Sequence, residues 1–367
     1  MGIKTVIMIL ASLSFSISAF ADHHMDGEKK PFSINGDFAT SLQLHSNENR
    51  NAGNNHDDFN VDLIEINIEK NWSQSKLHLS IGYGSTANAV NAAGTQSVNT
   101  LNVMNAYYHM HTSYGLGLSV GKFESPVGHE TYNQMDNSQF TRSYGFMLAP
   151  YFSTGLNFNY AQDMWAVGLI VSNGQGRDVD TGDNNKTMAI TIDVDPMENL
   201  SFDLNYVTGT EATLIGGANT AAVTREINIL DFSAAYMINE MFDVALNYID
   251  HGQKLSAGGT DNKATSLAAY VNANLGMFGL GLRYEQFTYD SGIAAYNGPG
   301  TVFAAPVGTD NTISSITLSA KAEIDQNAMV ILEYRMDNGD DTGTFVDEKN
   351  VATDSQNTIT AGLMYRF

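Results

Sequence analysis

The chain ends in the stretch Thr360-Ala361-Gly362-Leu363-Met364-Tyr365-Arg366-Phe367, which has the alternation of a β-strand. Soluble domains commonly finish in a frayed polar segment. This chain instead finishes on a large apolar side chain, and Leu363, Tyr365 and Phe367 share one face of the predicted strand. The ending therefore predicts a strand whose outer face meets apolar surroundings.

The same period of two recurs along the chain, as in Leu77-His78-Leu79-Ser80-Ile81-Gly82-Tyr83. Each such segment has one apolar and one polar face, which is typical of a strand. Two of the segments, 58–70 and 98–110, change parity midway, which predicts a bulge or a misplaced end. We expect sixteen strands, near residues 32–45, 58–70, 76–84, 98–110, 115–123, 152–161, 164–172, 186–195, 199–208, 224–238, 241–250, 263–275, 277–289, 311–324, 327–336 and 356–367.

The connections between these segments alternate strictly between short and long. Short turns such as Asn239-Glu240 follow every even strand, and long polar connections such as 124–151 follow every odd one. Antiparallel strands with short periplasmic turns and long outer loops are typical of an outer-membrane barrel. We therefore predict an all-β fold: a single transmembrane antiparallel β-barrel over residues 32–367, with both termini in the periplasm.

A soluble sandwich, or a set of tandem β-domains, is the alternative. The clean alternation in nearly every segment, including the last, argues against it. All six prolines also fall outside the predicted strands, as an edgeless ladder requires. Both observations favour the barrel.

The first 21 residues have the layout of a secretory signal peptide. Lys4 precedes an apolar or small run, and Ala19-Phe20-Ala21 forms a cleavage site. A membrane-anchoring helix is the weaker alternative, because the run is short and interrupted by serines. We expect a periplasmic tail over 22–31 and localisation in the bacterial outer membrane. The formal charge of −22 makes nucleic acid and anionic membrane surfaces unlikely partners.

A membrane reverses the usual facing, so the polar side of each strand points into the lumen. A barrel of 16 strands is wide enough to hold an aqueous channel. Strand parity places more acids than bases on this inner wall. The predicted inward acids are Asp37, Glu65, Glu69, Asp193, Asp203, Asp231, Asp243, Glu285, Glu323 and Glu333, and the bases are Lys76, Arg225, Arg283, Lys321, Arg335 and Arg366. Among them, Asp203, Asp231, Glu333 and Arg335 are our candidates for the lumen wall.

The architecture resembles that of Gram-negative outer-membrane porins. The segment Gly121-Lys122-Phe123-Glu124-Ser125-Pro126-Val127-Gly128, with Phe140-Thr141-Arg142-Ser143 and Pro150 after it, is similar to the "putative β-barrel porin" families. The resemblance implies a homotrimer. It also implies that the terminal Tyr365 and Phe367 belong to the signal read by the barrel-assembly machinery.

In porins the third loop folds into the barrel and narrows the pore, so the resemblance gives connection 124–151 a role. Phe140, Tyr144, Met147 and Leu148 are spaced as on a helix, after a cap at Asp136 or Asn137. We expect this stripe to pack on the inner wall. The pore constriction would then comprise Glu124, Glu130, Asp136 and Arg142, with Arg283 as the main base at mid-height of the wall. An outer loop that caps the mouth or touches a neighbouring protomer is the alternative.

Catalysis and metal binding have weaker support. His78 and His109 point into the lumen from neighbouring strands, but two solvated wall histidines are commoner than a catalytic pair. Asp22-His23-His24 suits Cu(II) or Ni(II), and the acidic segments 178–183 and 337–341 lack the full spacing of a calcium loop. We expect no enzyme activity, no cofactor and no structural metal.

The sequence thus favours a general diffusion porin that passes small hydrophilic solutes and ions, with a modest cation preference. Its partners would be outer-membrane lipid and lipopolysaccharide, which divalent ions could bridge to the acidic loops. The alternative is a structural or adhesive barrel with a plugged lumen and partner-binding outer loops.

Overall fold

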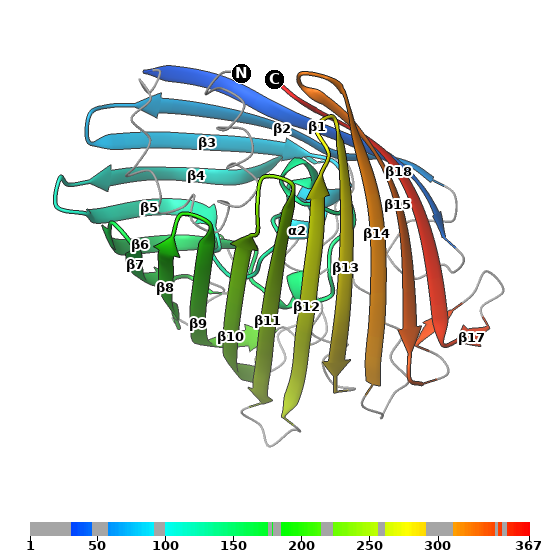
Figure 1. The fold of residues 1–367 in the computed structure, drawn as a ribbon. Helices are drawn as coiled ribbons and strands as arrows, with labels where there is room; N and C mark the ends of the chain where they lie inside the picture. Colours follow the sequence, from blue (N-terminus) through cyan, green and yellow to red (C-terminus); the bar gives the residue numbers. More distant parts are fainter. Residues whose placement is uncertain are drawn as a thin grey trace.

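The computed structural model describes residues 31–45, 58–91, 100–174, 178, 185–213, 223–255, 261–290, 311–341, 344–346 and 351–367. Sixteen strands within these residues form one closed antiparallel barrel (Figure 1). They are β1 (Phe32–His45), β2 (Asp58–Asn71), β3 (Ser75–Tyr83), β4 (Asn102–His111), β5 (Leu116–Glu124), β6 (Phe152–Gln162), β7 (Trp165–Ser172), β8 (Thr187–Met197), β9 (Leu200–Thr213), β10 (Val223–Met237), β11 (Phe242–Leu255), β12 (Asn262–Asn274), β13 (Phe278–Tyr289), β14 (Asn311–Asp325), β15 (Ala328–Gly339) and β18 (Ser355–Arg366). The predicted fold class is confirmed.

The first and last strands close the barrel. β1 pairs with β18 in a register that runs from Asp37 opposite Arg366 to His45 opposite Thr358. Phe367 extends this ladder, because its backbone N–H and C=O each bond Gly36 at 3.0 Å. A closed ladder pairs the backbone polar groups of its strands internally, as a lipid environment demands.

Side chains on the barrel strands alternate between an outer and an inner face. On β18, Leu363 and Tyr365 are each 39% exposed on the outer face, whereas Thr358 and Thr360 are buried on the inner face. Phe367 also lies on the outer face and is 51% exposed. The apolar outer face and polar inner face match a barrel set in lipid.

Both predicted breaks in parity are β-bulges. Asp62 is the extra residue of β2 between the pairs Ala39–Leu63 and Thr40–Val61. On β4 the register against β3 shifts at Met104 in the same way. Each bulge sends two successive side chains inward, because Asp62 and Leu63 are both buried, as are Met104 and Asn105. The acids Glu65 and Glu69 therefore face the lumen as predicted.

Short turns join the strands at the end of the barrel where the C-terminus lies. Arg366 N–H, for example, bonds Asn327 C=O in the turn between β14 and β15. Gly276 supplies the left-handed residue in the turn between β12 and β13, with φ of 83°. The predicted signal peptide, the tail up to residue 30 and most of the acidic segment 178–183 lie outside the described residues and stay predictions.

The helix predicted within 124–151 is wrong in type and extent. The structure has two short 3₁₀ turns there, η1 (Gln134–Asp136) and η2 (Gly145–Leu148). Asn133 caps η1 by accepting the N–H of Met135, and several carbonyls and amides between the two turns bond wall side chains. The loop thus gains partners that a continuous helix would exclude.

One α-helix lies in the described residues, and the sequence analysis missed it. This helix, α2 (Ser85–Asn91), follows β3 and buries Ala87 and Val90 in a cluster with Leu63 and Met104. It is too short for a clear periodic signal. A two-stranded hairpin, β16 (Phe345–Val346) with β17 (Ala352–Thr353), precedes β18. None of the helices in the described part of the chain is long and apolar enough to cross a membrane.

Candidate functional site in the barrel lumen

The third long connection, residues 124–151, lies inside the barrel as predicted. The N–H of Gly128 donates to Asp231 Oδ2 of β10 at 3.0 Å. Further along, Leu148 C=O lies 2.9 Å from His251 Nδ1 of β11. Figure 1 shows the segment within the ring of strands. We call it the lumen loop.

Two wall carboxylates hold the lumen loop by its backbone. Glu333 of β15 accepts the N–H of Phe140 at 2.7 Å and that of Thr141 at 3.2 Å. Glu285 of β13 accepts the N–H groups of Tyr144 and Gly145 at 2.8 Å and 2.7 Å. Charged hydrogen bonds of this kind are about twice as strong as neutral ones. The two glutamates therefore fix the stretch 140–145 against the wall.

A buried ion pair adds a third attachment. Arg283 Nη1 of β13 lies 2.5 Å from Glu130 Oε1, and neither side chain is exposed to solvent by more than 4%. Burial acts to raise the pKa of Glu130, but the guanidinium groups of Arg283 and Arg142 hold that pKa below its usual value. Glu130 is therefore ionised at neutral pH.

Arg142 organises the lumen loop from within. Its guanidinium donates to the carbonyls of Thr131 and Tyr132 at 2.5 Å and to that of Phe140 at 2.7 Å. Burial lowers the pKa of Arg142 to about 10, so the side chain stays charged at neutral pH. The loop thus folds around this arginine, which does not line the cavity described next.

The apolar stripe of the lumen loop packs on the inner wall. Tyr144 stacks on Phe287 with ring centroids 5.3 Å apart, and Leu148 belongs to the same buried cluster. Phe140 packs against Gly362 of β18, where an added Cβ would come within 2.7 Å of its ring. The predicted stripe is therefore seen for these three loop residues, with a glycine making room for one of them.

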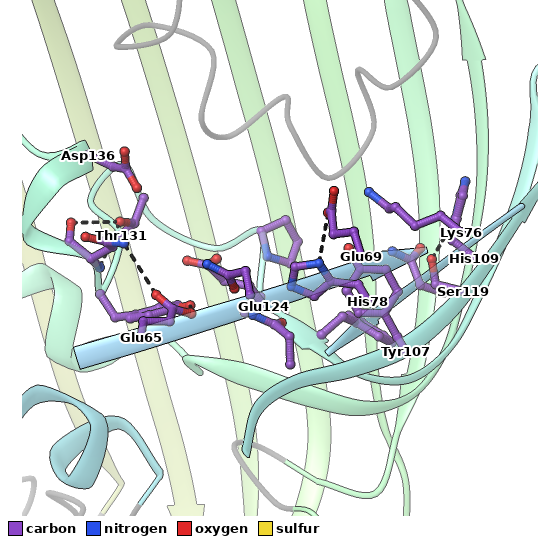
Figure 2. A pocket seen from close by; sticks show the side chains of 18 of the residues that line it. Glu65, Glu69, Lys76, His78, Tyr107, His109, Ser119, Glu124, Thr131 and Asp136 are labelled. Carbon is purple, nitrogen blue, oxygen red and sulfur yellow. Dashed lines mark hydrogen bonds and ion pairs between the residues drawn. The ribbon is translucent and has the colours of Figure 1, made fainter. Parts of the chain in front are cut away.

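A cavity of about 620 Å³ remains between the lumen loop and the inner faces of β1 to β6. Figure 2 shows part of its lining, with Glu65, Glu124 and His78 among the labelled side chains. Polar side chains dominate its lining, together with the rings of Tyr107, His78 and His109. Such a space can hold water or a small polar solute.

Carboxylates outnumber bases in the cavity lining. The acids are Asp37, Glu65, Glu69, Glu124, Glu130 and Asp136, and the bases are Lys76 and Arg366. Arg366 pairs with Asp37 at 2.6 Å and with Asp136 at 2.8 Å. Arg283 pairs with Glu130 from behind the lining, and the remaining five acids still outnumber the two bases.

A family model matches residues 33–367, nearly the whole barrel, and its description is "Putative beta-barrel porin-2, OmpL-like". The chain belongs to this porin family. It is accordingly an outer-membrane β-barrel of the porin type. No curated protein matches the sequence.

Solved structures of low sequence identity share the fold of this porin. An anion-selective porin from Comamonas acidovorans has a TM-score of 0.64 at 11% identity, with 92% of this chain and 99% of that one covered. The trimer form of in-vitro folded OmpT from Vibrio cholerae has a TM-score of 0.61 at 12% identity, with the same coverage. The outer membrane channel DcaP of Acinetobacter baumannii has 0.59 at 10%, covering 92% and 97%.

The residues predicted for the constriction of this porin fall into two groups. Glu124, Glu130 and Asp136 line the cavity, whereas the buried Arg283 and the partly buried Arg142 do not line it and make structural contacts. All four predicted lumen-wall residues lie buried on the inner face. Asp231, Glu333 and Arg335 each bond the backbone of the lumen loop, and the fourth residue is Asp203.

The lumen histidines of this porin do not converge on a common partner. His78 Nδ1 lies 2.9 Å from Glu69 Oε1 and stacks on Tyr107, while His109 Nδ1 lies 2.9 Å from Ser119 Oγ. In the described residues, no three His, Cys, Asp or Glu side chains form a group suited to a metal ion.

Several lumen residues escaped the sequence analysis of this porin. The backbone clamp of Glu285 and Glu333 has no sequence signal beyond their inward parity, because main-chain N–H groups are its donors. Lys122 was also missed; it bonds Asn91 of α2 at 2.6 Å and pairs with Asp178 at 2.9 Å. Alternation with Leu118 and Val120 places Lys122 on the outer face of β5, so strand parity could not reveal these contacts.

Proposed function

We propose that this protein is a general diffusion porin, which passes small hydrophilic solutes and ions passively through its lumen. The observation that carries the proposal is the polar cavity beside the lumen loop, inside a closed barrel of 16 strands. A barrel of that size leaves interior space that its own side chains do not fill. Membership in the porin family supports a channel and gives no reason to assign catalysis.

Planar-bilayer recording of the purified protein tests this proposal. Insertion of a diffusion porin gives discrete, steady current steps in KCl. Heat-denatured protein at the same detergent concentration is the control for leakage. Absence of steady steps from protein shown to be folded by its heat-sensitive gel mobility contradicts the proposal.

We further propose a modest cation preference. Six acids and two bases line the cavity, and a net negative lining concentrates cations. The reversal potential across a KCl gradient measures the preference directly. The anion-selective porin of Comamonas acidovorans shares only the fold with this chain, so it carries no argument on selectivity. An anion-selective result would contradict the proposal and implicate Arg142 and Arg283.

A plugged structural or adhesive barrel is the second candidate, and one observation favours it. The lumen loop packs against the inner wall from β9 to β15, where Arg283, Glu285, Thr317 and Arg335 are at most 1% exposed. Folded protein that inserts into bilayers yet shows no steps, and that binds a partner through its outer loops, would support this candidate over the first.

We propose a homotrimer, cleavage of the signal peptide after Ala21, and recognition of Tyr365 and Phe367 by the barrel-assembly machinery. The Vibrio cholerae structure of the same fold is described as a trimer form, which supports the oligomeric state. Light scattering of the detergent-solubilised protein measures its mass. Deletion of Phe367 should lower the amount that reaches the outer membrane, and unchanged levels would contradict the assembly role.

A further inference from the structure

Two carboxylates of the cavity lack a basic partner. Glu124 makes no side-chain hydrogen bond or ion pair with any described residue, although it lies at the end of β5 and lines the cavity. Glu65 is held by neutral donors: Tyr132 Oη at 2.6 Å and the hydroxyl of Ser80. Glu65 and Glu124 thus present to the cavity two carboxyl groups that no basic side chain engages.

The other cavity acids are already paired. Arg366 pairs with Asp37 and Asp136, Arg283 pairs with Glu130, and His78 pairs with Glu69. Figure 2 shows Glu124 between Glu65 on one side and Glu69 with His78 on the other. The two carboxyl groups without a basic partner therefore lie in one part of the cavity.

Flat rings line the same cavity as these two carboxyl groups (Figure 2). His78 and Tyr107 are stacked, with ring centroids 5.2 Å apart and planes 25° apart, and both line the cavity. Lys76 Nζ lies 5.8 Å from the centroid of the Tyr107 ring, a separation at which an aromatic face attracts a cation. Rings beside carboxylates suit a ligand that has a cationic end and a flat, less polar end.

We propose that the cavity is a binding site for a small organic cation, an aromatic amine or a related guanidinium compound. Its cationic group lies against Glu124 and Glu65, and its ring lies against Tyr107 and His78. The volume of about 620 Å³ is in the range of small-molecule sites. A bare metal ion fits less well, because no three suitable ligands group together in the described residues.

The inference deepens the proposed porin function and rests on it, because the solute enters through the lumen. The first measurement is block of single-channel current by tyramine, which has an ammonium group and a phenol ring. Two probes serve as comparisons: ethylamine, which lacks the ring, and 4-hydroxyphenylacetate, which replaces the cation by an anion. We expect saturable block by tyramine, weaker block by ethylamine and none by the anion.

Variants assign the block to the site. Glu124→Gln should weaken the affinity for tyramine about tenfold, the loss expected for one charged contact. The matched control is Glu323→Gln, which removes an exposed acid near the end of β14 that does not line the cavity. Tyr107→Leu should weaken the block by tyramine and leave the block by ethylamine unchanged. Equal block by tyramine and the anion, or equal effects of the two glutamate variants, overturns the inference.

Calorimetric titration of the folded protein in detergent separates this inference from the proposed function. If the protein gives no current steps but binds tyramine with a heat that Glu124→Gln reduces, the binding site is supported and the porin function is rejected. If the protein gives steady current steps but tyramine neither blocks them nor releases binding heat, the binding site is rejected and the porin function is supported. If Glu124→Gln does not fold, Glu65→Gln and Tyr107→Leu make the same test.

Discussion

Gly36 and Phe367 meet at the seam of the barrel, and their contact leaves no room for a side chain. A Cβ on Gly36 would lie 2.3 Å from Glu65 C=O and 2.6 Å from the Phe367 ring. The glycine is therefore part of the reason that the terminal phenylalanine can lie flat on the outer face beside Tyr365.

We predict that Gly36→Val destabilises the barrel by about 1–3 kcal/mol, as overpacking typically does. Gly279→Ala is the control, because a Cβ there meets only Lys321 Cβ at an ordinary 3.7 Å. Thermal unfolding followed by loss of the heat-sensitive gel mobility measures the difference. Equal unfolding temperatures for the two variants would contradict a tight seam.

The pair formed by Glu130 and Arg283 gives a pH prediction. The pKa of Glu130 is lowered in the folded protein, so its contribution to stability is present above the ordinary value of 4.5 and is lost only as the pH falls below it. We expect the stability difference between the protein and Glu130→Gln to be constant from about pH 8 to pH 5.5. A difference that disappears by about pH 6 would contradict the lowered pKa.

At the scale of elements, the strands could be predicted because lipid imposes a strict pattern on them. Every barrel strand was located, and the parity breaks marked the bulges at Asp62 and Met104. The outer ends of β9 and β11 were placed too early, at 208 and 250, because alternation fades where a strand leaves the membrane. The path of the lumen loop depends on wall carboxylates that bind main chain, and a local pattern cannot reveal those partners.

The clamp on the lumen loop yields a prediction for pore size. Replacing both Glu285 and Glu333 by Gln removes the charged acceptors from four backbone N–H groups, at about 1.5–3 kcal/mol for each charged bond. We expect larger or fluctuating conductance steps, because the narrowest section of a pore dominates its resistance. Glu323→Gln is the control. Parent-like conductance in the double variant would show that other contacts suffice to hold the loop.

At the scale of the whole molecule, charge and screening decide selectivity. The screening length falls from about 10 Å at 0.1 M salt to about 3 Å at 1 M. We therefore predict that the cation preference measured in a dilute KCl gradient shrinks as both compartments are made more concentrated. A preference that does not depend on salt would point to one tight site instead of the summed charge of the lining.

Because the clamp binds the backbone, it fixes the position of the lumen loop independently of most side chains that the loop turns toward the cavity. Glu285 and Glu333 grip amide groups, which every residue except proline carries, so much of the loop's side-chain chemistry can be rewritten without dislodging it. Glu124, which faces the cavity, is open to such change, whereas Asp136, which pairs with Arg366, and Arg142 are not. One barrel with one anchored loop can therefore serve channels that prefer different solutes or ions.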